Sequence, residues 1–119
     1  MLAAIVLDCR HAAPQARFWA AALGWQIRPY DDAEIARLAG LGRTPETDAS
    51  VAVDSPDGSV TFWCTEVPEP KSVKNRMHLD LRASDPGALI ELGARVVAEQ
   101  DGWTTYLDPE GNEFDVLRG

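Results

Sequence analysis

The sequence predicts an α+β fold built from two βαβββ modules in tandem. Each half of the chain has the same order of elements, a strand, a helix and three further strands, and short motifs recur at matching places. Leu23–Ile27 (LGWQI) corresponds to Leu92–Val96 (LGARV), and Ser55–Gly58 (SPDG) corresponds to Asp108–Gly111 (DPEG). Neither module is large enough to close a core alone, so we expect their sheets to pack into one curved cup with a cleft.

The first module is expected to occupy about residues 1–67. It opens with a strand over Ala4–Cys9, in which alternation places Asp8 on the opposite face from Leu7. A helix over Ala12–Leu23 follows, because apolar residues recur at helical spacing and Gly24 supplies a left-handed stop. The elements expected next, in chain order, are a strand over 25–28, a short helix capped by Asp32 and ended by Gly40 and Gly42, a loop over 43–49, and strands over 50–54 and 59–66.

A polar connector over residues 68–76 separates the modules, and Pro68 and Pro70 within it resist regular structure. The second module is expected at about residues 77–119. Its expected elements are a strand over 77–83, a helix that opens at Asp85 and Pro86 and closes at Gly93, and strands over 94–99, 103–107 and 112–118. A chain of 119 residues then forms a single domain, residues 1–119.

Composition excludes several classes of partner. The net charge is −8, with 19 acidic and 11 basic residues, which argues against binding to a nucleic-acid backbone. No apolar run approaches the roughly 20 residues that a membrane span needs, and Met1–Asp8 lacks the basic start of a signal peptide. Cys9 and Cys64 lie far apart without a CxxC pair, which argues against a disulfide scaffold. We therefore expect a cytoplasmic protein that binds neither nucleic acid nor membrane.

Several motifs resemble those of the vicinal oxygen chelate superfamily, which includes the bleomycin-resistance proteins. They are Phe18-Trp19 with Leu23-Gly24-Trp25 at the helix end, and Asp108–Asn112 (DPEGN) before the last strand. A narrower resemblance, to the glyoxalase-like domains common in high-GC bacteria, lies in Pro68–Lys71 (PEPK), Val73–Arg76 (VKNR) and His78–Leu81 (HLDL). The resemblance spans nearly the whole chain. It implies a bacterial homodimer with a cup in which glyoxalases, extradiol dioxygenases and thiol transferases hold a divalent metal.

The resemblance also implies four metal positions, on the first and last strands of each module. In this chain they fall on Ala4, about Phe62, His78 and Asp115, and two of the four carry no ligating group. Catalytic zinc and non-haem iron sites normally take three protein ligands. Asp80, on the same strand face as His78, is the candidate third ligand. We expect no metal cofactor here, and a divalent metal at His78, Asp80 and Asp115 is the alternative.

Without a metal, the same positions form a small-molecule pocket, apolar at Ala4 and Phe62 and polar at His78 and Asp115. The residues expected to act in catalysis are His78 and Asp115. Those expected to contact a ligand are Asp8, Phe62, Asp80, Arg82 and Trp103. His78 can instead be a half-buried structural histidine, and Arg82 can simply neutralise the neighbouring carboxylates.

Three functions follow from these residues. The first is a metal-independent protein that sequesters or senses an unknown small molecule, as bleomycin-type resistance proteins do in metal-free cups. The second is a metal-dependent lyase, isomerase or dioxygenase of the glyoxalase type. The third is a metal-free proton-transfer enzyme in which Asp115 orients the His78 imidazole.

Overall fold

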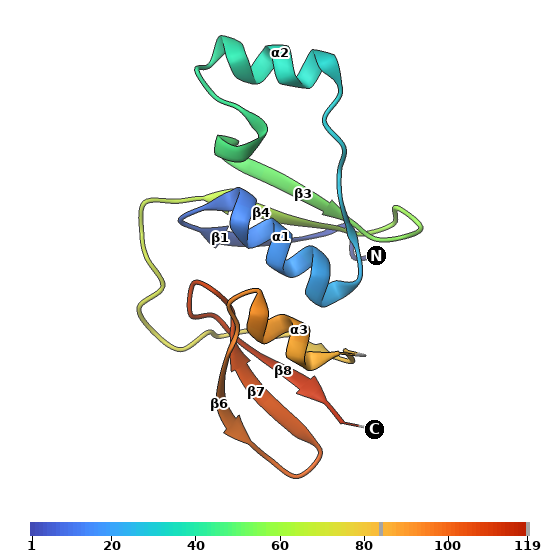
Figure 1. The fold of residues 1–119 in the computed structure, drawn as a ribbon, viewed down its shortest axis with the longest axis vertical. Helices are drawn as coiled ribbons and strands as arrows, with labels where there is room; N and C mark the ends of the chain where they lie inside the picture. The colour runs from blue at the N-terminus through green and yellow to red at the C-terminus, as the bar shows by residue number, and fades with distance from the viewer. Residues whose placement is uncertain (84, 119) are drawn as a thin grey trace.

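The fold contains two four-stranded sheets and three α-helices among residues 1–83 and 85–118, which the computed structural model describes (Figure 1). The first module comprises β1 (Ala4–Cys9), α1 (Ala12–Leu23), β2 (Gln26–Ile27), α2 (Asp32–Gly40), a 3₁₀ turn (Pro45–Thr47), β3 (Ser50–Asp54) and β4 (Thr61–Glu66). The second comprises β5 (Asp80–Leu81), α3 (Pro86–Glu91), β6 (Arg95–Glu99), β7 (Trp103–Leu107) and β8 (Glu113–Leu117). None of the described helices is long and apolar enough to cross a membrane.

The two sheets have the same strand order, which confirms the predicted repeat of βαβββ modules. The N-terminal sheet runs β1-β4-β3-β2 and the C-terminal sheet runs β5-β8-β7-β6. In each, the outer first strand is parallel to the last strand of the module, and the other pairs are antiparallel. β5 is shorter than the predicted strand over 77–83, since only Asp80 and Leu81 have register partners on β8.

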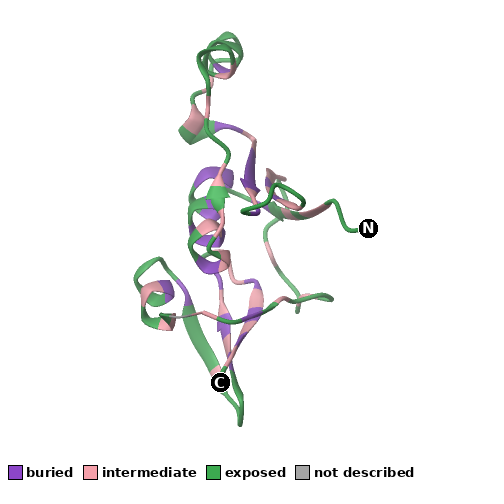
Figure 2. Cartoon of the chain, turned by 90° about the vertical axis from the view of Figure 1, so that its right-hand side faces the viewer, coloured by how far each residue is buried: buried purple, intermediate pink, exposed green. Residues whose placement is uncertain are grey.

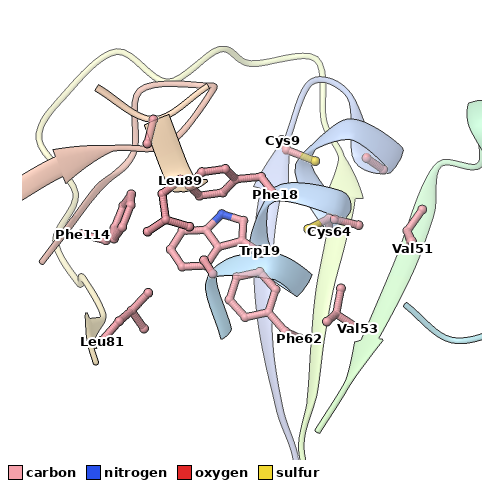
Figure 3. Close-up of a cluster of buried hydrophobic side chains, with 14 of the residues drawn as sticks. Cys9, Phe18, Trp19, Val51, Val53, Phe62, Cys64, Leu81, Leu89 and Phe114 are labelled. Carbon is pink, nitrogen blue, oxygen red and sulfur yellow. The ribbon is translucent and has the colours of Figure 1, made fainter. Parts of the chain in front are cut away.

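Helix α1 packs between the modules and organises the core. The Trp19 ring stacks on Phe62 of the N-terminal sheet with centroids 5.2 Å apart, and meets Phe114 of the C-terminal sheet edge-on, also at 5.2 Å. Figure 3 shows Trp19 lying among these rings and Leu89 of α3. The helix ends where the sequence predicts, at Gly24, whose φ of +68° is the left-handed conformation that glycine adopts at no steric cost.

A buried carboxylate joins the two modules. Asp108, fully buried at 0% exposure, accepts hydrogen bonds from Gln15 Nε2 at 2.5 Å and from Trp19 Nε1 at 3.0 Å. The side-chain amide of Asn112 donates to the same carboxylate at 2.9 Å. Buried polar groups in proteins are almost always paired in this way, so the turn at Asp108–Gly111 is fixed against α1.

Helix α2 differs from its prediction in its cap and in its packing. Asp31, rather than Asp32, is the N-cap, and its side chain accepts from the Glu34 amide at 2.8 Å. Leu38 is the one buried residue of the helix, and Ile35 and Leu41 are 44% and 65% exposed. The predicted loop over 43–49 contains the 3₁₀ turn. Figure 1 shows α2 standing beyond β3 at one end of the molecule.

Each sheet has one side turned away from α1, which we call its open face. Figure 2 shows burial concentrated on the central helix, with exposed residues on the outer elements. On β1, Ile5 and Leu7 pack against the core, whereas Val6 between them is 60% exposed on the open face. On β8, Phe114 and Val116 are buried, so the intervening Asp115 lies on the open face of the C-terminal sheet.

Candidate functional site

Three predicted residues meet on the open face of the C-terminal sheet, and we call them the His78 cluster: His78, Asp80 and Asp115. The Nδ1 atom of His78 lies 3.2 Å from Oδ1 of Asp80 and 3.6 Å from Oδ2 of Asp115. The other Asp115 oxygen accepts a hydrogen bond of 2.5 Å from the Thr105 hydroxyl, which fixes that carboxylate. One imidazole therefore faces two carboxylates.

The strand register explains this convergence. His78 and Asp80 are two residues apart in extended chain, so their side chains project to the same side. Asp115 on β8 lies between two register partners. These are Asp80 on the parallel strand β5 and Thr105 on the antiparallel strand β7. The connector before the cluster is held by Glu113, whose carboxylate accepts from Lys71 Nζ at 3.1 Å and from the Asn75 amide at 2.9 Å.

The cluster remains accessible. The side chains of His78 and Asp80 are 43% and 51% exposed, whereas that of Asp115 is 15% exposed. Two of the cluster's three side chains are carboxylates, which are acceptors of hydrogen bonds. Such a site attracts cations and hydrogen-bond donors.

The donor set for a divalent metal fits only in part. The side chain of Ala4 has no donor atom, and that of Phe62 is a ring, 2% exposed, that stacks on Trp19. Neither of these two positions, which the family resemblance implies, can bind a metal. One donor atom from each member of the His78 cluster nevertheless lies within 4.8 Å of the others. One nitrogen and two carboxylate oxygens suit a first-row divalent ion, and these three residues would hold it.

Trp103 and Phe62, two of the residues expected to contact a ligand, lie in different places. Trp103, 39% exposed, lies two residues before Thr105 on β7 and shares the open face with the cluster. Phe62, which is expected to contact a ligand, is buried on β4 and stacks on Trp19 of α1. It reaches His78 only across a cavity of about 80 Å³ that both residues line.

Asp8 and Arg82 lie apart from the cluster. Asp8 is on β1 and lines a cavity of about 210 Å³ with Lys71 and Glu110. Arg82 borders the junction between α1 and α3. Among the described residues no ion pair joins Arg82 to Asp8 or Asp80, so the predicted neutralisation is not formed.

A larger cavity contains none of the predicted site residues. Its volume is about 630 Å³, and it lies between α2 and the open face of the N-terminal sheet. Its lining residues are Arg28, Pro29, Tyr30, Glu34, Arg37, Leu38, Leu41, Arg43, Asp48, Ala49, Ser50, Ala52 and Trp63. In the sequence, this cavity could have been indicated by the segment over residues 28–49. That segment lies between β2 and β3 and has no counterpart between β6 and β7 of the second module.

Residues 4–117 match the family described as Glyoxalase-like domain. The chain belongs to this family. No curated protein matches it.

Solved structures with a similar fold include several relatives of low sequence identity. A possible glyoxalase from Bacillus cereus is 12% identical, with 99% of this chain and 98% of that chain covered and a TM-score of 0.65. The fosfomycin resistance protein FosX from Mesorhizobium loti is 13% identical, with coverages of 100% and 91% and a TM-score of 0.62. A glyoxalase/bleomycin resistance protein/dioxygenase family enzyme from Burkholderia phytofirmans is 15% identical, with coverages of 96% and 94% and a TM-score of 0.61. At these identities the likeness establishes the glyoxalase-like fold alone.

Proposed function

We propose that this glyoxalase-like protein binds a small organic molecule through the His78 cluster, using its own side chains and no metal cofactor. The observation that carries the proposal is one imidazole within 3.2 and 3.6 Å of two carboxylates on an exposed sheet face. Trp103, on the same sheet face and two residues before Thr105, offers an exposed aromatic surface. A few converging polar groups next to apolar surface are the usual makeup of a small-molecule site.

The charge of the cluster indicates which part of a ligand it would contact. Two carboxylates accept hydrogen bonds, so a hydroxyl, amine or other donor group is favoured there. The Thr105 hydroxyl already donates to Asp115 at 2.5 Å, which leaves Asp80 as the more available acceptor. We therefore propose a ligand with a polar donor group at one end and an apolar part that reaches Trp103.

We also propose that the protein is a cytoplasmic homodimer. Val6, at 60% exposure, leaves apolar surface on the open face of the N-terminal sheet, which a second copy would cover. Cys9 and Cys64 are free thiols, as is usual in a reducing compartment.

Thermal melts in the presence of a small-molecule library test the proposal. Wild type is compared with His78→Ala and with His11→Ala, since His11 is exposed and its side chain caps nothing at the start of α1. We expect compounds that raise the melting temperature of wild type and His11→Ala to lose this effect in His78→Ala. Hits that stabilise all three proteins equally would contradict a role for the cluster.

A metal-dependent lyase, isomerase or dioxygenase is the second candidate. Its supporting observation is the approach of three donor atoms to within 4.8 Å of one another. A bound divalent ion would supply Lewis-acid chemistry, and the residues holding it would be those of the His78 cluster. Elemental analysis and melts with Mn²⁺, Fe²⁺, Ni²⁺ and Zn²⁺ decide between the candidates, because an ion at a hundredfold above its Kd stabilises by about 2.7 kcal/mol. Stabilisation lost in both His78→Ala and Asp80→Asn would favour the metal enzyme.

A further inference from the structure

We propose that the cavity beneath α2 is a second ligand site, which binds an organic monoanion with a flat apolar body, such as an aromatic carboxylate. The site is independent of the His78 cluster, none of whose residues lines this cavity. The inference rests on the shape of the cavity, its apolar floor and the balance of its charges.

The cavity exists because α2 is held away from the sheet. The segment over residues 28–49 leaves β2, forms α2 and the 3₁₀ turn, and returns at β3. Of α2 only Leu38 is buried, so the helix does not close onto the strands below it. The resulting volume of about 630 Å³ falls in the range of about 300–1,000 Å³ that holds drug-sized molecules.

The floor of the cavity is a flat aromatic surface with a fixed cation. The guanidinium of Arg28 lies 5.2 Å from the centre of the Trp63 ring. Asp54 accepts two hydrogen bonds from Arg28, each 2.8 Å long, and so holds it in place and neutralises its charge. Leu41, which is 65% exposed, adds apolar surface on the α2 side. A planar apolar group can therefore lie between this floor and the helix.

The charges that line the cavity leave one guanidinium poorly compensated. Arg37 pairs with Glu34 at 2.9 Å, within the helix. Arg43 lies 3.9 Å from its paired carboxylate, that of Glu66. Its guanidinium donates a hydrogen bond of 2.5 Å to the backbone carbonyl of Thr47. At 3.9 Å an exposed pair contributes little, so the carboxylate of Glu66 compensates the charge of Arg43 only weakly.

The acids of the lining limit the ligand to one negative charge. Asp48 is occupied by the hydroxyl of Tyr30, which donates to it at 2.7 Å. Burial, with the hydrogen bond to Asp48, raises the pKa of Tyr30, so the phenol stays neutral. Glu34 and Asp48 would repel a polyanion, whereas Arg43 would repel a cation. A single carboxylate at Arg43 matches this balance.

The test uses 2-naphthoate and its neutral analogue 2-naphthamide as probes, with Kd measured by isothermal titration calorimetry. We expect wild type to bind naphthoate about tenfold or more tightly than naphthamide, and Arg43→Gln to lose that preference. Arg43→Lys should restore part of it by returning the charge. Arg95→Gln, which removes an exposed arginine from β6, is the matched control and should bind as wild type does.

Other results would overturn the proposal. They are equal Kd values for the two probes, the same change in Arg43→Gln and Arg95→Gln, or no saturable naphthoate binding up to about 1 mM. Loss of naphthoate binding in His78→Ala with none in Arg43→Gln would place the probe at the His78 cluster. That outcome would support the proposed function and reject the second site.

Discussion

Asp108 is buried and forms no salt bridge among the described residues, and its carboxylate is held by hydrogen-bond donors. The side chains of Gln15, Trp19 and Asn112 donate to it within the core. We predict that Asp108→Ala lowers the free energy of unfolding by about 3 kcal/mol or more, because three buried donors lose their acceptor. Urea denaturation measures the loss. Asp101→Ala, in an exposed turn, is the control and should stay within about 0.5 kcal/mol of wild type; equal losses would contradict the role of Asp108.

The two thiols are expected to be unreactive in the folded protein. Burial, reinforced by the carboxylates of Glu110 and Glu66, raises the pKa of Cys9 to about 12. Burial is also the main reason that the pKa of Cys64 is raised. Because the thiolate is the reactive form, we predict slow alkylation by iodoacetamide at mildly alkaline pH and fast alkylation in urea, measured by mass spectrometry. Rapid labelling of the native protein would show that these residues are not packed as described.

The His78 cluster could be predicted from the sequence because strand alternation fixes local directions. His78 and Asp80 are two residues apart, and Asp115 was found through the motif resemblance. Thr105 could not be found in this way, because its contact with Asp115 depends on the register between β7 and β8. Phe62 was placed only approximately, through the family's metal positions, and a shift of one residue along a strand moves a side chain to the other face.

At the scale of elements, helix ends that are marked by a local signal were predicted best. The bounds of α1 follow from apolar spacing and from Gly24, and they agree with the structure to the residue. β5 was overestimated because strand length depends on the partner, and β8 offers it only two register partners. The cap of α2 was misplaced by one residue between the adjacent Asp31 and Asp32, since either side chain can cap a helix.

Gly24 provides a prediction at this scale. Its φ of +68° strains any residue with a Cβ, so Gly24→Ala should lower the free energy of unfolding by about 1–2 kcal/mol. Gly40→Ala is the control, since Gly40 lies in α2 without a positive φ and has open space around its added Cβ. That substitution should be neutral or stabilise by up to about 1 kcal/mol. Urea melts in which both variants lose stability equally would contradict the assigned cap.

For the whole molecule, the repeat predicted two similar modules with packed sheets, but not that α1 lies between those sheets. The packing of α1 between the sheets depends on contacts such as Trp19 with Phe114, which lie far apart in sequence. The cavity beneath α2 was also missed, because it arises from the segment over 28–49 that breaks the repeat. Sequence patterns report local period and turns, whereas cavities depend on the spaces left between packed elements.

The proposed homodimer makes a prediction about the open faces. Val6 is 60% exposed on β1, and Val6→Asp would bury a carboxylate if a second copy packs there. We predict that the substitution weakens dimerisation at least about tenfold in analytical ultracentrifugation. Val73→Asp, at a 72% exposed site in the connector, is the control and should leave the dimer intact. A monomeric wild type, or equal effects of both substitutions, would reject this interface.

The central claim, that a ligand binds at the His78 cluster, is tested most directly by NMR of the histidine rings. The chain has two histidines, so the imidazole region contains two sets of signals, and His11→Ala assigns them. We predict that a compound that stabilises the protein shifts the ring signals of His78 in a saturable manner and leaves those of His11 in place. A compound shown to bind by calorimetry that moves neither ring, or only that of His11, would contradict it.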